Sequence, residues 1–203
     1  MDQAEFERWE SRFAAPDYVF GTAPNAFLKA QAHLLPTHGR ALSIADGEGR
    51  NGVFLAEHGL DVLSVDFSPS AQEKARKLAA ERGVSIRTEQ ADIVNWRWPE
   101  AAFDVVVAIF FQFVDPPERE KIFAGIKKTL KPGGLLLLEG YRPEHIKNDN
   151  GGPRQPERCY TRPLLEQAFK DFASIDIREY DTELAEGSRH VGASALIDLV
   201  GRK

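Results

Sequence analysis

The feature that most constrains the fold is the stretch 41–66, ALSIADGEGRNGVFLAEHGLDVLSVD. Residues 41–45 are an apolar run of strand length, and residues 46–49 are a tight turn with two glycines. Residues 51–58 have helical apolar spacing, and residues 62–65 are a second apolar run. Two such strands joined by one helix make a βαβ unit with parallel strands and a right-handed crossover. Such sheets bind ligands at the carboxyl ends of their strands.

The glycine turn predicts a ligand that contains a nucleotide. Gly47 and Gly49 lack the side chains that would keep a cofactor off the backbone, and glycine tolerates a positive φ. Asp66 ends the second strand nineteen residues after Gly47, where an acid can accept hydrogen bonds from both ribose hydroxyls. A plain glycine turn with a surface aspartate is the alternative, and the flanking strands make it less favoured.

The remaining elements can be placed from apolar runs and helix boundaries. We expect further strands at residues 84–88, 103–109 and 135–139. We expect helices at residues 2–13, 116–130 and 164–172, and one more that begins at the cap Ser68 and ends at Gly83. The run 103–109, FDVVVAI, is continuously apolar, as in a central parallel strand that is buried on both faces.

The carboxyl-terminal stretch breaks this alternation of strands and helices. Two predicted strands, residues 174–180 and 193–202, are joined by a polar turn at residues 186–190 and not by a helix. Strands joined so directly are antiparallel. A dinucleotide dehydrogenase half would end on a parallel strand, so the hairpin counts against that class. His190, in SRHVG, either points into a site or caps the turn.

With these residues in view, the chain resembles the class I S-adenosylmethionine-dependent methyltransferases, in particular their small bacterial, tellurite-resistance-type branch. The resemblance covers nearly the whole chain. It rests on GEGRN in the first loop, Asp66, EQADIVNW around Asp92, LKPGGLLLLEG and the terminal strand pair. It implies a doubly wound, Rossmann-like α/β fold with a seven-stranded sheet of order 3-2-1-4-5-7-6, in which strand 7 is antiparallel. The resemblance is specific for fold and cofactor and weak for substrate.

The cofactor implied by the resemblance is S-adenosylmethionine, with S-adenosylhomocysteine as product. The first loop would hold the methionine moiety, Asp66 the ribose, and Asp92 the adenine amino group. The implied cofactor-binding residues are Ala45, Asp46, Gly47, Glu48, Gly49, Arg50, Asn51, Asp66, Phe67, Ser68, Ala91, Asp92, Ile93 and Ile109. The chain departs from the family pattern at Ser43 and Ala45, where an acid is usual. Its acids fall at Asp46 and Glu48, and which carboxylate holds the methionine amino group stays open.

The acceptor pocket is expected at the end of the strand 103–109, which faces the reactive methyl group in related enzymes. Its implied lining is Tyr18, Phe110, Phe111, Gln112, Phe113, Tyr141 and Arg158, although an ordinary core would also use the phenylalanines. Tyr141, His145 and His190 are the candidate catalytic groups, because each could accept a proton from the acceptor or orient it.

Two segments are expected to cover this pocket. Within a single domain spanning residues 1–203, residues 1–35 would form an N-terminal helical lid to which Asn25 contributes a polar group. Residues 141–162 are rich in Gly, Pro and Asn and long for a connection in a compact domain, which is typical of a substrate loop.

Composition narrows the class of partner. A length of 203 residues with 42% hydrophobic content suits one domain, and a net charge of −5 argues against nucleic acid as the main partner. No apolar run approaches the roughly 18 residues of a membrane span, and the acidic amino terminus lacks a signal-peptide pattern. We expect a cytoplasmic monomer or homodimer that uses neither a metal nor a membrane partner.

The sequence therefore predicts methyl transfer from S-adenosylmethionine to a small-molecule acceptor by in-line displacement. Such a reaction needs approach geometry and removal of water, and it needs a base only if the acceptor carries a proton. The alternatives are a non-catalytic S-adenosylmethionine-binding protein, an NAD-dependent oxidoreductase, and a macromolecular methyltransferase, for which the chain is short and acidic.

Overall fold

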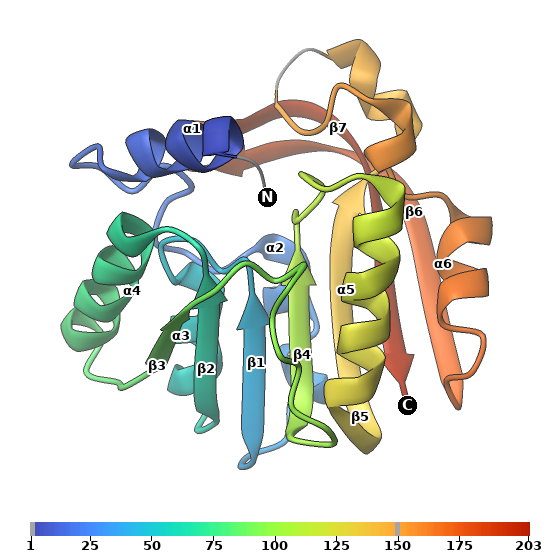
Figure 1. Cartoon of the computed structure of the whole chain (residues 1–203), viewed down its shortest axis with the longest axis horizontal. Helices are drawn as coiled ribbons and strands as arrows, with labels where there is room; N and C mark the ends of the chain where they lie inside the picture. Colours follow the sequence, from blue (N-terminus) through green and yellow to red (C-terminus); the bar gives the residue numbers. More distant parts are fainter. Residues whose placement is uncertain (1–2, 149–150) are drawn as a thin grey trace.

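Figure 1 shows the computed structural model of the chain, which describes residues 3–148 and 151–203. Its strands are β1 (Arg40–Ile44), β2 (Asp61–Asp66), β3 (Arg87–Gln90), β4 (Phe103–Ile109), β5 (Leu130–Tyr141), β6 (Ser174–Glu186) and β7 (His190–Arg202). Within the described residues they form a seven-stranded sheet of order β3-β2-β1-β4-β5-β7-β6. β1 to β5 pair in parallel, and β7 is antiparallel to both β5 and β6. The predicted fold class, sheet order and antiparallel strand are confirmed.

Helices cover both faces of this sheet. They are α1 (Gln3–Phe13), α2 (Ala26–Ala30), α3 (Arg50–Glu57), α4 (Pro69–Glu81), α5 (Pro116–Thr129) and α6 (Arg162–Ala168), with the 3₁₀ turns η1 (Ala32–Leu34), η2 (Pro143–Asn148) and η3 (Pro156–Arg158). The cap predicted at Ser68 is present, since its Oγ accepts the Ala71 N–H at 3.0 Å and Pro69 occupies the first turn of α4. Among the described helices, none is long and apolar enough to span a bilayer.

The core lies on the two sides of β4, because successive side chains of a strand point to opposite faces. Val105 and Val107 pack in one buried cluster with residues of α2 and α3. Val106 and Ala108 pack in the other, with residues of α5 and α6. β4 thus has the two-sided burial that its continuous apolar run predicts.

Two strands begin at other residues than predicted. β3 begins at Arg87 and not at residue 84, because Val84 and Ile86 pack against α3 and α4. β5 already begins at Leu130, and its register against β4 shifts between the pairs Phe103–Leu130 and Val105–Leu135. The sequence LKPGG therefore ends the helix as predicted, but it forms an irregularity inside the strand pairing and not a separate loop.

The largest difference concerns the terminal hairpin, where β6 continues to Glu186 and β7 begins at His190. β5 pairs with β7 only from Leu196 to Arg202. The remaining residues, 181–195, pair only with each other and form what we call the β6–β7 ribbon. Figure 1 shows the ribbon bending across the carboxyl ends of the sheet towards α1. Its many polar residues give little strand signal, since the pairing depends on backbone hydrogen bonds.

Candidate functional site

A cavity of about 560 Å³, its open mouth included, lies at the carboxyl ends of β1, β2 and β4. Eight of the expected cofactor-binding residues line it, namely Ala45, Asp46, Gly47, Arg50, Asn51, Asp66, Phe67 and Ile109. Phe110 and Phe113 of the expected acceptor pocket and the candidate base His190 also line it. The remaining lining residues are Trp9, Phe13 and Phe20.

The first loop turns sharply enough to require left-handed backbone. Ala45, Gly47 and Gly49 have φ values of 47°, 57° and 88°. At Gly49 a Cβ atom would lie 2.5 Å from the Cβ of Ala75 in α4, so a side chain there would push two helices apart. The loop's GEG sequence therefore serves the turn and the packing of α3 on α4 as well as the approach of a ligand.

Asp46 holds this loop from the inside. Its carboxylate accepts hydrogen bonds from the hydroxyls of Ser43 and Ser64, both at 2.7 Å, and from the Gly52 N–H at 3.1 Å. Burial raises the pKa of Asp46, and these donors oppose the rise. Ser43, which departs from the family pattern, is thus a partner of the acid that follows it.

Glu48 also bonds to other groups of the protein. Its carboxylate accepts the Val19 N–H at 2.7 Å and forms an ion pair with Lys74 of α4 at 2.7 Å. Glu48 is buried and does not line the cavity. Both acids of the loop therefore stabilise the protein itself, Asp46 the turn and Glu48 the amino-terminal segment.

Asp66 ends β2 at the wall of the cavity. One of its oxygens accepts the Gly47 N–H and the other the Ser68 N–H, both at 2.9 Å. Burial raises the pKa of Asp66 to about 7, with the amides opposing and the charge of Asp46 adding to the rise. Because each carboxylate oxygen can accept a second hydrogen bond, Asp66 retains capacity for ligand hydroxyls.

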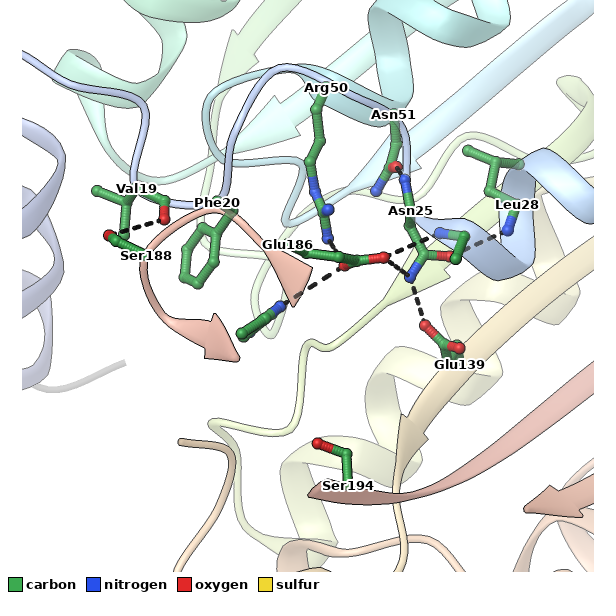
Figure 2. A network of polar contacts seen from close by, with 12 residues as sticks. Val19, Phe20, Asn25, Leu28, Arg50, Asn51, Glu139, Glu186, Ser188 and Ser194 are labelled. Atoms are coloured by element: carbon green, nitrogen blue, oxygen red, sulfur yellow. Dashed lines mark hydrogen bonds and ion pairs between the residues drawn. The ribbon is translucent and has the colours of Figure 1, made fainter. Parts of the chain in front are cut away.

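Arg50, at the start of α3, brings a positive charge to the same cavity. Its Nη2 lies 2.7 Å from Oε2 of Glu186, which the β6–β7 ribbon places over the first loop (Figure 2). Glu186 also accepts the Ala26 N–H at 2.9 Å. The other terminal nitrogen of Arg50, Nη1, is buried without a hydrogen-bond partner. A buried unpaired donor on a cavity wall fits the carboxylate of an amino-acid ligand.

His190 is the candidate catalytic residue that the structure places at the cavity. Its ring lies between those of Phe20 and Phe110, with centroids 4.4 Å and 4.6 Å away. Its Nδ1 faces Oε2 of Glu186 at 3.9 Å. Of the two interpretations of His190 that the sequence left open, the structure favours a residue of the site.

Tyr141 and His145, the other two candidates, do not line the cavity. Tyr141 stacks behind Phe110, with centroids 4.7 Å apart and planes 24° from parallel, and it is buried. His145 lies behind Tyr141, at 4.0 Å, where its Nε2 faces the Gly151 carbonyl at 3.0 Å. Both residues support the ring of Phe110 and do not reach the cavity.

Besides Tyr141, four other residues of the expected acceptor pocket lie outside the cavity lining. Phe111 is fully buried in the core against Phe123 and Tyr160, because it follows Phe110 on the opposite face. Gln112 is buried and ties β5 to the next loop, donating to the carbonyls of Tyr141 at 2.9 Å and Arg158 at 3.1 Å. The guanidinium of Arg158 pairs with Asp115 at 2.9 Å. Tyr18 packs on Val53 and Leu78 and donates its hydroxyl proton to the Lys74 carbonyl at 3.1 Å.

Six expected cofactor residues also lie outside the cavity lining, and they are Glu48, Gly49, Ser68, Ala91, Asp92 and Ile93. Ser68 caps α4 and its hydroxyl donates to Glu10. Asp92 caps the turn that follows it, accepting the Val94 N–H and the Asn95 side-chain amide, both at 3.0 Å. Ile93 belongs to the core.

Sequence reasoning did not assign Trp9 and Phe13 to the site. They lie on the apolar face of α1, which was expected as part of the helical lid without a residue of its own being assigned, and they line the cavity together with Phe20. Phe13 approaches the first loop closely, since a Cβ on Gly47 would lie 3.4 Å from its ring. Aromatic residues at helical spacing were the available signal, but a core helix has the same pattern.

Asn25 joins the amino-terminal segment to α3 and to β5 (Figure 2). Its N–H donates to Asn51 of α3 at 2.9 Å, and its side-chain amide donates to Glu139 of β5 at 2.5 Å. Its Oδ1 caps α2 by accepting the Leu28 N–H at 3.0 Å. Asn25 is fully buried, so it anchors the segment and does not offer a polar group to a ligand.

Comparison with known proteins agrees with this geometry. Residues 41–134 match the family described as "Methyltransferase domain". A demethylmenaquinone methyltransferase from Thermus thermophilus is 34% identical over 106 residues, which are 51% of this chain and 48% of that protein. A phosphatidylethanolamine N-methyltransferase from Cereibacter sphaeroides is 27% identical over 165 residues, 80% of this chain and 78% of that protein. The chain spans about half the length of several curated relatives that it matches.

A solved structure of a SAM-dependent methyltransferase from Methanosarcina mazei has the same fold. It superimposes with a TM-score of 0.67 over 89% of this chain and 98% of that one, at 19% sequence identity. The domain match and this shared fold confirm the resemblance to class I methyltransferases.

Proposed function

We propose that the chain, whose residues 41–134 match a methyltransferase domain, is an S-adenosylmethionine-dependent methyltransferase that acts on a small molecule. One observation carries the proposal. One cavity is lined both by the buried acid Asp66 and by Arg50, whose Nη1 is buried without a hydrogen-bond partner among the described residues. S-adenosylmethionine has complementary groups, a ribose diol and an amino-acid carboxylate.

The residues present fit this cofactor. Asp66 would accept hydrogen bonds from the ribose hydroxyls, and Arg50 would pair with the carboxylate of the methionine moiety. Gly47 would leave room for the ligand beside the loop. When bound, the cofactor supplies a methyl group on a sulfonium, which an acceptor can attack in line. The chain itself would bind, align the acceptor and exclude water, which are the main contributions of a protein to such a reaction.

We further infer that residues 1–35 act as a lid on the cavity, although residues 1 and 2 lie outside the described part of the chain. Trp9, Phe13 and Phe20 of this segment line the cavity. The segment is held on both sides, since Glu48 accepts the Val19 N–H and Val19 in turn accepts the Ser188 N–H at 2.9 Å. This double attachment supports a lid that closes when the ribbon is in place.

The expected substrate loop, residues 141–162, has an indirect role in our proposal. Its residues 149 and 150 lie outside the described part of the chain. Tyr141 and His145 pack behind Phe110 and so hold one wall of the cavity. This loop would act on the acceptor through the position of Phe110.

A small acceptor is supported by the site and by a relative. The cavity is enclosed by aromatic side chains of the lid, and the chain is acidic overall, which suits neither a nucleic acid nor another polyanion. The relative from Thermus thermophilus is named for demethylmenaquinone as its acceptor. The antiparallel β7 disfavours the NAD-dependent alternative. Cytoplasmic location and a monomeric or homodimeric state stay predictions.

The test is a ligand comparison on the purified protein. A ligand that binds only the folded state raises the melting temperature, so S-adenosylmethionine and S-adenosylhomocysteine are expected to raise it and NAD is not. Titration calorimetry with S-adenosylhomocysteine then gives the affinity. A rise with NAD alone would replace the proposal by an oxidoreductase, and no rise with any of the three would refute cofactor binding. Binding without transfer to any acceptor would favour the non-catalytic alternative.

A further inference from the structure

The flank of the cavity nearest the ribbon, formed by Phe20, Phe110 and His190, defines the class of acceptor. Resting on the proposed function, we propose that the acceptor is an uncharged aromatic molecule bearing a hydroxyl group. We assign His190 as the catalytic base that takes the hydroxyl proton. Glu186 and Arg50 act as positioning residues that orient and support the imidazole.

The flank is built from stacked rings. The centroids of Phe20 and Phe110 lie 4.4 Å and 4.6 Å from that of His190. Tyr141 backs Phe110 from behind, with the two rings stacked. Phe110 adopts φ 54°, a left-handed conformation that is uncommon for a residue with a side chain and recurs at ligand sites. Such a wall offers ring faces and edges, which a flat aromatic guest matches better than an aliphatic one.

The flank carries no net charge that would attract a charged acceptor. Arg50 is positive, but the carboxylate of Glu186 balances it at 2.7 Å, with both side chains buried. The carboxylates of Asp46 and Asp66 lie on the loop side and hold Ser43, Ser64 and backbone amides. Among the described residues that line the cavity, the carboxylates Asp46 and Asp66 come from the first loop and the end of β2, and Arg50 is the one Lys or Arg side chain, so the three rings of the flank bring no charged group of their own.

Glu186 is held firmly enough to orient His190. Its Oε1 accepts the Ala26 N–H at 2.9 Å and the side-chain amide of Asn25 at 3.3 Å, and its Oε2 pairs with Arg50. The same Oε2 lies 3.9 Å from Nδ1 of His190, a charge contact longer than a hydrogen bond, and Nδ1 has no hydrogen-bond partner among the described residues. A carboxylate beside Nδ1 favours the tautomer with the proton on Nδ1, which leaves the lone pair of Nε2 free. It also stabilises the imidazolium that forms when Nε2 gains a proton.

A general base must be unprotonated before the reaction, and the surroundings of His190 favour its neutral form. Burial lowers the pKa of His190, and Arg50 and His145 lower it further, while Glu186 opposes them. Tyr141 also faces the imidazole, with ring centroids 6.1 Å apart. The imidazole is therefore neutral at pH 7 and able to accept a proton. Below the pKa of His190 it would be protonated and unable to act.

The proposed step balances in atoms and charge. The acceptor hydroxyl gives its proton to Nε2 of His190, and the oxygen lone pair forms a bond to the methyl carbon of the cofactor. The carbon–sulfur bond breaks, and its electron pair stays on sulfur. The products are the methyl ether, neutral S-adenosylhomocysteine and the imidazolium of His190, which then releases its proton to water.

The test uses phenols of different acidity as acceptors for the full-length protein. Phenol itself needs a base at pH 7, whereas pentafluorophenol is already ionised. We expect His190→Gln to lower kcat/KM for phenol by about 100-fold, the typical contribution of a general base, and to lower it far less for pentafluorophenol. The acidic limb of the pH profile should disappear with phenol. Glu186→Gln should have the same selectivity with a smaller loss, about 10-fold.

Three controls separate the possible failures. His33→Gln, at an exposed site in η1, should leave both rates unchanged. Affinity for S-adenosylhomocysteine should be the same in wild type and His190→Gln, because His190 is assigned to the acceptor. An equal loss with both phenols would show that His190 is only structural and would overturn the assignment. A protein that binds S-adenosylhomocysteine but methylates neither phenol would overturn the acceptor class and leave the proposed function intact, whereas failure to bind the cofactor would refute the proposed function itself.

Discussion

The two walls of the cavity are built in opposite ways. On the loop wall, the bonds that hold Asp46 and Asp66 join residues between 2 and 19 positions apart in the sequence. On the ribbon wall, Ala26 donates to Glu186 across 160 positions, and the Ser188 hydroxyl donates to the Val19 carbonyl at 3.2 Å across 169. The loop wall is formed by one continuous βαβ unit. The ribbon wall forms only when the amino-terminal segment and the β6–β7 ribbon, which are far apart in the sequence, pack against each other.

This difference assigns separate roles to the two walls. The loop wall packs into the core through α3 and α4, so its geometry is inseparable from the stability of the domain. The ribbon extends beyond the sheet, where it is held by the amino-terminal segment, by the ion pair of Glu186 with Arg50 and by a hydrogen bond from Asn148 of η2. We expect changes in the loop wall to alter folding and cofactor affinity, and changes in the ribbon wall to alter local closure and the acceptor step.

The largest expected effect is that of Gly49→Ala in the loop wall. The new Cβ would lie 2.5 Å from the Cβ of Ala75 at a φ of 88°, so the chain must bear backbone strain and separate α3 from α4. We expect a loss of about 3 kcal/mol in the free energy of unfolding, measured by urea titration. Gly83→Ala is the matched control, because its φ is 71° and nothing lies within 4 Å of its Cβ, and it should cost about 1 kcal/mol. Equal losses would show that the helix contact is unimportant.

The next effect is on the cofactor, from Asp66→Asn. Loss of a charged acceptor should weaken binding of S-adenosylhomocysteine by about 2 kcal/mol, or about 30-fold, measured by calorimetry at pH 8, where Asp66 is ionised. Asp61→Asn, at the exposed opposite end of the same strand, should change affinity less than about twofold. An unchanged affinity in Asp66→Asn would remove Asp66 from the cofactor site.

A smaller effect is expected from Gly187→Ala at the tip of the ribbon. Its Cβ would lie 2.4 Å from the Val19 carbonyl oxygen, at a φ of 66°. The clash is as severe as that at Gly49, but the ribbon can lift away, so we expect a global loss of only about 1 kcal/mol. Hydrogen exchange should show lost protection of the Ser188 N–H, which donates to Val19.

Two results would contradict this picture of the ribbon. One is a global loss in Gly187→Ala as large as that of Gly49→Ala. The other is unchanged protection of Ser188. Gly133→Ala serves as the control, because it has a similar φ of 76° and open space around its Cβ, and it should leave the exchange of Ser188 unaltered.

The smallest expected effect is a difference between the two walls in how their contribution to stability depends on pH. Burial raises the pKa of Asp66 to about 7, so its stability contribution is fully present below its unfolded pKa and is lost as the pH rises through 7. Burial alone would also raise the pKa of Glu186, but His190, Arg50 and the Ala26 N–H outweigh it and lower the pKa to about 2. The contribution of Glu186 is therefore present above its unfolded pKa and is lost as the pH falls towards 2.

This contrast is measured by urea titration of the wild type and of the variants Asp66→Asn and Glu186→Gln between pH 3 and 8, which gives the free energy of unfolding at each pH. Near pH 7, the free energy of unfolding of the wild type should fall by less than about 1 kcal/mol per unit of rising pH, and Asp66→Asn should abolish this fall. Glu186→Gln should leave that slope unchanged and alter stability only in the acidic range. A change near pH 7 in Glu186→Gln alone would reverse the assignment of the two carboxyl groups.

The sheet was predictable because its signals are local. The apolar runs at β1, β2 and β4, the glycine turn and the cap at Ser68 each follow from side chains that lie near one another in the sequence. The same reasoning failed at Phe111 and Gln112, which follow the strand β4 just as Phe110 does. Their orientation depends on which face the chain presents after the strand ends, and packing against α5 and Tyr160 decides that.

From the sequence we could predict the βαβ unit, the sheet order through the family resemblance, and ten of the residues that line the cavity, eight expected at the cofactor together with Phe110 and Phe113. Periodicity, glycine and capping act over a few residues, so one stretch of chain suffices to reveal them. The folded chain was needed to show that His190, and not Tyr141 or His145, lies at the cavity, and that Trp9 and Phe13 share its lining. Those positions depend on how far β6 and β7 pair beyond the sheet and on where the amino-terminal segment meets them. Backbone hydrogen bonds between distant residues set that geometry, and they leave no periodic trace in the sequence.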